Sequence, residues 1–345
     1  MLLFMAGCVS EELRSARLYI QQESWANAEE YLLKASKVEP ENPEIPFLLG
    51  HEIYSREQEW SKMNETFDKA LSLGPDIQMT INNRTAKVSD MVQAAREQHW
   101  VTIYNQGVGF FNEARKVGGT DSPELQNAIK AFRTATNVDP NNGAAYGILA
   151  NCLFAAGDLD GALEAASTGA IKDPDNFDAN MAAGKMYLTA KDYESALIYY
   201  RKAVNLDPTD SMARRQLAQT YYDVGDKEMS LGTYEVAIAN ETDPDIKADL
   251  HYNLGVLNMQ LEDFQAAEDN FSMAYDLNPD DIDALRGIAQ TFETAEEWSR
   301  AEYYYRRLID IESENPQHYR AMARVLLRQG YTDEAQEYFD KSKEL

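Results

Sequence analysis

The stretch NFDANMAAGKMYLTAKDYESALIYYRKAVNLDP, residues 176–208, decides the fold. In it a glycine is followed by a tyrosine three residues later, by an alanine twelve residues later and by a second tyrosine four residues beyond that alanine. The stretch DIDALRGIAQTFETAEEWSRAEYYYRRLIDIES, residues 281–313, has alanine, phenylalanine, alanine and tyrosine at the same spacings. A pattern that returns in step at distant places indicates a repeat architecture.

The repeat extends in both directions from these two stretches. Each copy shows apolar residues at i, i+3, i+4 and i+7 in two runs, which predicts two amphipathic helices. Small side chains let the two helix axes approach closely, and a proline near the end of most copies stops the second helix. We assign nine copies: 9–42, 43–77, 78–142, 143–176, 177–210, 211–244, 248–281, 282–315 and 316–345.

This pattern resembles the tetratricopeptide repeat, a 34-residue helix-turn-helix motif. The resemblance implies an all-α fold, a superhelix of the α-solenoid type with about nine repeats. It also implies a concave surface that binds a peptide or protein. The expected organisation is a leader remnant at 1–8, repeats 1–2 at 9–77, an enlarged repeat 3 at 78–142, repeats 4–6 at 143–244 and repeats 7–9 at 248–345.

Repeat 3 departs from the pattern because its two small positions, Gly107 and Ala128, lie 21 residues apart. No proline or glycine occurs between residues 77 and 106, so we predict one long helix from about residue 77 to 116. A loop at 117–123 should follow, with Ser122 as the N-cap and Pro123 in the first turn of the next helix. The enlargement is either a tolerated insertion or a loop that shapes a binding site.

Composition excludes several classes of function. The chain has 58 acidic and 32 basic residues and a net charge of −26, so nucleic acid and anionic lipid headgroups are poor partners. Four separated histidines predict no metal site, and Cys152 is expected to be a buried, inert thiol. No phosphate loop or nucleophile motif is present in the sequence. We therefore expect a protein without enzymatic activity or cofactor.

The partner-binding groove is expected on the first helix of each repeat, as the resemblance implies. Basic residues recur along this stripe, which favours an acidic segment or a C-terminal carboxylate as the partner. An alternative is that the arginines pair with carboxylates of adjacent helices. The expected groove residues are Asn151, Lys185, Arg215, Gln219, Tyr222, Tyr252, Met259, Arg286, Gln290, Arg320, Arg324 and Leu327.

The N-terminal run LLFMAGC, residues 2–8, is similar to the end of a bacterial lipoprotein signal, in which lipid is attached to the cysteine, here Cys8. The basic region of such a signal is missing, so we expect the printed start to lie inside a longer signal. Lipid on Cys8 would be the only link to a membrane and would place the protein in a bacterial cell envelope. Val9 after the cysteine favours the outer membrane.

An alternative to this interpretation stays open. The run could be an untidy N-terminus that packs on the first repeat. In that case the protein would be a soluble cytoplasmic co-chaperone or adaptor of the same fold, rather than an anchored scaffold.

Overall fold

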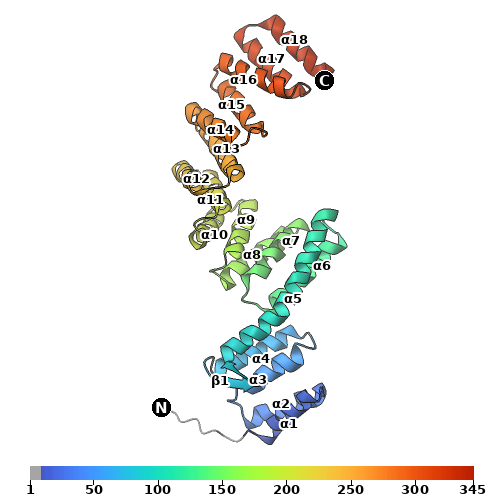
Figure 1. The fold of residues 1–345 in the computed structure, drawn as a ribbon. Helices are drawn as coiled ribbons and strands as arrows, with labels where there is room; N and C mark the ends of the chain where they lie inside the picture. Colours follow the sequence, from blue (N-terminus) through green and yellow to red (C-terminus); the bar gives the residue numbers. More distant parts are fainter. Residues whose placement is uncertain (1–8) are drawn as a thin grey trace. The chain divides into compact units, whose positions relative to one another are not determined.

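The computed structural model describes residues 9–345, and Cys8 lies outside the described residues. Eighteen α-helices follow one another through this part of the chain, accompanied by one π-helical turn and one β-hairpin. Successive helices form antiparallel pairs (Figure 1), which confirms the predicted all-α, α-solenoid fold class. The chain divides within α9 into a first compact unit that ends at Met186 and a second that begins at Tyr187.

The first unit holds the helices of repeats 1–4 and most of α9. Its elements are α1 (Glu11–Gln21), α2 (Trp25–Val38), α3 (Glu44–Leu48), the π-helical turn η1 (Leu49–Tyr54), α4 (Trp60–Leu73), β1 (Gln78–Ile81), β2 (Arg84–Lys87), α5 (Val88–Val117), α6 (Pro123–Val138), α7 (Gly143–Ala155), α8 (Leu159–Lys172) and α9 (Phe177–Thr189).

The second unit continues with helix pairs of similar length. Its elements are α10 (Tyr193–Leu206), α11 (Ser211–Val224), α12 (Lys227–Asn240), α13 (Pro244–Gln260), α14 (Phe264–Leu277), α15 (Asp283–Thr294), α16 (Trp298–Ile311), α17 (Pro316–Gln329) and α18 (Thr332–Glu344).

In repeats 3 and 7, a small residue on the first helix faces an aromatic ring on the second. A Cβ added at Gly107 would lie 2.9 Å from the Phe132 ring, and one added at Gly255 would lie 2.9 Å from the Phe271 ring. Both phenylalanines are almost completely buried. Close approach of the helices therefore depends on the missing side chain, as the sequence predicts.

Six aspartates of the described residues cap helix N-termini: Asp158, Asp192, Asp210, Asp226, Asp243 and Asp263. Asp192 accepts a hydrogen bond from the backbone N–H of Ser195, and Asp158 accepts one from that of Gly161. These carboxylates satisfy backbone donors that have no partner inside the helix, and their charge complements the helix dipole. Part of the net negative charge is thus explained by helix capping rather than by ligand binding.

The predicted helix from about residue 77 to 116 is wrong at its start. Residues 78–87 form an antiparallel hairpin in which Met79 pairs with Ala86, and α5 begins only at Val88. Asn82 and Asn83 both adopt positive φ angles, of 49° and 64°. Such a pair is typical of a two-residue hairpin turn, and asparagine tolerates it better than most residues. The Asn-Asn dipeptide is therefore a turn signal.

The other features predicted for repeat 3 are present. The helix continues through residue 117, and Ser122 caps α6 by accepting a hydrogen bond from the backbone N–H of Leu125 at 3.2 Å. Pro123 stands in the first turn of α6.

The long helix α5 has two different neighbours along its length. Near its start, Val88, Met91 and Val92 pack into the core that repeats 1 and 2 share. Further on, Gly107 lies against Phe132 of α6. Because α5 packs on the core of repeats 1 and 2 at its start and on α6 further on, it spans the space between repeat 2 and α6 (Figure 1).

Polar contacts fix this arrangement of α4, α5 and α6. Arg96 of α5 is buried and donates hydrogen bonds to Asn64 at 2.8 Å and to Asp68 at 2.9 Å, both on α4. The Asn64 amide donates in turn to the backbone carbonyl of Asn137, at the end of α6. Side chains of three helices therefore hold one another in place.

Candidate functional site

The two groove residues expected in the first unit come together. The Lys185 ammonium donates a hydrogen bond to the Asn151 side-chain oxygen at 3.1 Å, although the residues belong to different repeats. The same ammonium lies 5.9 Å from the centre of the Phe154 ring. These two expected groove residues are thus in direct contact where repeats 4 and 5 meet.

In the second unit, Arg324 is bound to a carboxylate of the preceding repeat. Its guanidinium donates two hydrogen bonds to Glu293 of α15, and the Tyr305 hydroxyl donates a third at 2.6 Å. Burial opposes the ionisation of Glu293, but these hydrogen bonds and the charge of Arg324 outweigh it, so the pKa of Glu293 lies below its ordinary value. Arg324 is therefore engaged within the protein.

Two of the other three basic residues in this part of the stripe also have carboxylate partners. Arg286 pairs with Asp283 of its own helix, and Arg215 lies 3.7 Å from Asp249 of α13. By contrast, Arg320 is exposed and has no carboxylate within 4.0 Å among the described residues. The alternative predicted from the sequence, pairing with carboxylates of adjacent helices, thus describes Arg215 and Arg324, whereas Arg286 pairs within its own helix.

The remaining expected groove residues differ in their packing, exposure and hydrogen bonds. Tyr252 packs edge-on against Phe271 with ring centres 5.4 Å apart, and Tyr222 and Met259 lie against the buried cores of their repeats. Leu327 is 58% exposed. Gln219 donates a hydrogen bond to Asp223 on its own helix, and Gln290 is exposed.

A hollow of about 370 Å³ lies beside Arg215, where the first helices of repeats 6 and 7 meet. Its lining includes four carboxylates, those of Asp207, Asp210, Glu241 and Asp249, against the single guanidinium. A surface of this composition repels an acidic ligand. The structure therefore gives no support at this point of the stripe for the predicted preference.

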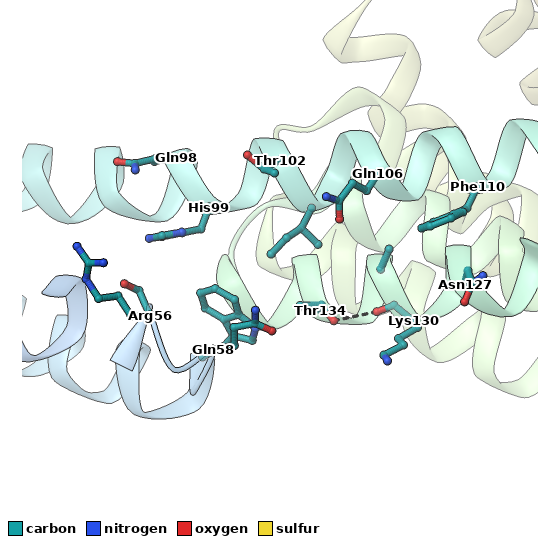
Figure 2. Close-up of a pocket in the computed structure, with 14 residues that line it drawn as sticks. Arg56, Gln58, Gln98, His99, Thr102, Gln106, Phe110, Asn127, Lys130 and Thr134 are labelled. Atoms are coloured by element: carbon teal, nitrogen blue, oxygen red, sulfur yellow. Dashed lines mark hydrogen bonds between the residues drawn. The ribbon is translucent and has the colours of Figure 1, made fainter. Parts of the chain in front are cut away.

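A larger cleft, of about 610 Å³, was not foreseen from the sequence. It lies in the first unit, between the turn that follows η1, the middle of α5 and the facing side of α6 (Figure 2). Helix α5 contributes a row that includes His99, Thr102, Gln106 and Phe110, and α6 contributes Asn127, Lys130 and Thr134. These residues recur at helical spacing, so each helix presents one face to the cleft.

The charge of the cleft differs from that of the chain. None of its 14 lining residues is aspartate or glutamate, whereas Arg56 and Lys130 are both cations. Arg56 stacks on the Trp25 ring at 3.9 Å and lies 3.7 Å from Glu52. No carboxylate of residues 9–345 lies within 4.0 Å of the Lys130 ammonium.

His99 contributes a polar atom without a protein partner. Its Nε2 atom is buried and makes no hydrogen bond, and its ring lies 5.6 Å from that of Trp60. Burial, and then the charge of His51, lower the pKa of His99, so the ring is neutral at pH 7. A buried nitrogen of this kind can accept from or donate to a ligand.

The sequence held one signal for this cleft. Polar residues recur at helical spacing at positions 99, 102 and 106 of α5 and at 127, 130 and 134 of α6. Locating the cleft required knowing that α5 extends from repeat 2 to α6. The loop at 117–123 does not line it.

Cys152 lies in the core of its repeat, away from both hollows. Burial raises the pKa of its thiol to about 12, as expected of an inert cysteine. Within residues 9–345 no three side chains of His, Cys, Asp or Glu lie close enough together to hold a metal ion. None of the helices in that range has both the length and the apolar character needed to cross a bilayer.

Comparison with known families agrees with the repeat pattern. Three sequence models of the tetratricopeptide repeat match, one at residues 122–186, one at 162–211, 215–282 and 259–318, and one at 316–340. Together they cover more than half of the chain. None of the curated proteins compared with the chain matches it.

Solved structures are similar as well. A tetratricopeptide repeat protein from Parabacteroides merdae is 16% identical over 72% of this chain and 93% of its own, with a TM-score of 0.52. MamA is 26% identical over 49% of this chain and 90% of its own, with a TM-score of 0.43. PilW, described as a type IV pilus biogenesis factor, is 19% identical over 57% and 90%, with a TM-score of 0.49.

Proposed function

Because the chain belongs to the tetratricopeptide repeat family, we propose that it is a non-enzymatic scaffold that binds a peptide or protein partner. The observation that carries this proposal is that helix pairs extend from Glu11 to Glu344, with one short hairpin between them. Within each unit, stacked repeats present side chains of successive first helices along a shared surface, which suits an extended partner.

The proposed binding residues lie on first helices of both units, among them Asn151 and Lys185 in the first unit and Arg215 and Arg320 in the second. An acidic segment or a C-terminal carboxylate is the proposed partner. Arg320 supports this choice because its guanidinium is exposed and has no carboxylate partner among the described residues, so binding would cost no internal ion pair. Arg324 supports it less, since Glu293 already occupies its donors.

We also propose that lipid on Cys8 anchors the scaffold in a bacterial cell envelope, with the outer membrane as its destination. The support is the run LLFMAGC directly ahead of a polar repeat array. One acyl chain holds a protein only reversibly, whereas two or more hold it stably. A cytoplasmic adaptor is the alternative function.

The anchoring test compares wild type with Cys8→Ser, both expressed with the full upstream reading frame and labelled with a fatty-acid analogue. Wild type should take up label and sediment with membranes, and the serine variant should do neither. If the serine variant labels and sediments like wild type, the anchored scaffold gives way to the cytoplasmic adaptor.

The groove test uses Arg320→Glu beside Lys202→Glu, which makes the same change of charge on the second helix of another repeat. Both variants serve as bait in a pull-down from envelope extract. Partners should be lost only with Arg320→Glu, and added salt should weaken capture by wild type. Equal capture by all three baits would remove Arg320 from the binding surface.

A further inference from the structure

The cleft of about 610 Å³ that α5, α6 and the turn after η1 enclose, called the cleft below α5, is separate from the proposed groove. Relative to Gly107, the positions of repeat 3 equivalent to the groove stripe are Tyr104, Val108 and Phe111, and none of them lines the cleft. The cleft therefore is not the family's usual binding surface. It arises because α5 bridges repeat 2 and α6 and leaves space between them.

Its charge points to a carboxylate ligand. In a chain with 58 acidic residues, 14 residues line this space without a single carboxylate among them. Arg56 and Lys130 lie on opposite sides of it (Figure 2), and the Lys130 ammonium has no carboxylate partner in residues 9–345. Protein walls of low dielectric concentrate the field of such cations inside a cleft.

The uncharged polar residues point to a peptide backbone. Gln58, Gln98, Gln106 and Asn127 all line the space, and each carries a primary amide. A primary amide both donates and accepts hydrogen bonds, so it can pair with the alternating N–H and C=O groups of an extended chain. The buried Nε2 atom of His99 also makes no hydrogen bond within the protein. A peptide backbone could supply the missing partner.

Apolar contacts complete the site. Trp60, Ile103 and Phe110 line the cleft, and Phe110 is 39% exposed. A volume of about 610 Å³ falls within the usual range of ligand pockets. We propose that this cleft binds an extended, acidic peptide segment of a partner protein, with its carboxylates toward Arg56 and Lys130 and its apolar side chains on Trp60 and Phe110.

The probe is a short fluorescein-labelled peptide of alternating Glu and Leu with both termini blocked, beside the same peptide with Gln in place of Glu. Fluorescence anisotropy with the full chain measures binding. The Glu peptide should bind saturably, and added salt should lower its affinity. The affinity of the Gln peptide should be lower by a factor of about ten or more. Absence of binding, or equal binding of both peptides, would overturn the proposal.

Matched variants on α6 locate the binding. Lys130→Glu and Arg133→Glu change the charge equally on the same helix, but only Lys130 lines the cleft. We expect about a tenfold loss of Glu-peptide affinity for Lys130→Glu and little change for Arg133→Glu. Gln106→Glu, nearly equal in size to the native residue, should also weaken binding. Circular dichroism confirms that each variant is folded, and equal effects of the two α6 variants would sink the proposal.

Two further measurements distinguish binding in this cleft from binding elsewhere and from self-association. If Arg320→Glu abolishes binding of the Glu peptide and Lys130→Glu does not, the peptide binds the second unit, which overturns this inference and leaves the proposed groove intact. Analytical ultracentrifugation tests for a second copy as the occupant. Self-association that disappears in Lys130→Glu would identify this chain, rather than another protein, as the ligand and overturn the proposal of a separate partner.

Discussion

The cleft below α5 and the hollow beside Arg215 both lie where neighbouring repeats meet, yet their charges are opposite. The first has two cations and no carboxylate, and the second has four carboxylates around one guanidinium. In the second, Asp210 caps α11 by accepting a hydrogen bond from Ala213, and the Asp207 side chain accepts two from Thr209. These acids belong to the turn that an ordinary repeat needs before its next helix.

The wall of the cleft that α5 forms lacks such acids because no turn between repeats lies there. This wall is the uninterrupted middle of α5, where no helix begins and no capping carboxylate is required. Basic residues on a repeat surface therefore do not by themselves make an anion site. The carboxylates that the fold requires nearby decide the local charge, and the enlarged repeat removes them.

The largest expected effect comes from disturbing the helix crossing that supports the cleft. A Cβ at Gly107 would lie 2.9 Å from the Phe132 ring, whereas one at Gly109 would have no neighbour within 4 Å. Gly107→Leu should therefore destabilise the protein by about 1–3 kcal/mol and weaken peptide binding to the cleft. Gly109→Leu should stabilise it slightly, since leucine favours helix over glycine.

Urea denaturation followed by circular dichroism measures both changes, and the Arg215 hollow provides the comparison. Gly107→Leu should leave that hollow unaltered because it lies in the other unit. Equal stability of the two glycine variants would show that Phe132 can move aside, and would remove the argument that this crossing shapes the cleft.

The sequence predicts features that depend on contacts within one repeat, and it does not predict features that depend on contacts between repeats. The helix pairs, the Ser122 cap and the small residue facing an aromatic ring depend on neighbours within one repeat, and periodicity predicts them. The hairpin at 78–87 escapes that prediction because its turn signal, Asn82 and Asn83, lies in a stretch without glycine or proline. The cleft depends on where the two ends of α5 pack, which periodicity does not specify.

The arginines of the stripe show the same limit. Sequence spacing placed Arg324 on the surface of a first helix but gave no information on Glu293, which lies 31 residues earlier. Pairing between repeats depends on the rotation of one helix pair against the next. The predicted stripe therefore mixes an engaged arginine, Arg324, with an exposed one, Arg320, that has no carboxylate partner in residues 9–345.

An intermediate effect is expected from that pair of arginines. Arg324→Ala leaves the partly buried Glu293 with only the Tyr305 hydroxyl, which should cost about 1 kcal/mol after allowance for the 56% exposure of the Arg324 side chain. Arg320→Ala removes no ion pair and should change stability by less than about 0.5 kcal/mol. Thermal unfolding of both variants is the measurement. A double variant, Arg324→Ala with Glu293→Gln, should recover part of the loss, and no recovery would contradict the pairing argument.

The smallest expected effect concerns pH, and it compares the two histidines of the first unit with Glu293 of the second. Burial lowers the pKa of His51 and of His99, and His51 lowers that of His99 further, so protons bind these rings more readily in the unfolded chain. The stability they contribute is complete above the unfolded value of about 6.5 and falls as the pH drops below it. Glu293 has a lowered pKa as well, but its contribution is complete above the unfolded value of about 4.3 and is lost only at lower pH. The first unit should therefore begin to lose stability at a higher pH than the region of Glu293.

This order is tested with denaturant midpoints between about pH 7.5 and 5.5. Wild type is compared with a double variant that carries His51→Gln and His99→Gln. The double variant should lose less stability over that window, and equal losses would show that neither histidine titrates with unfolding.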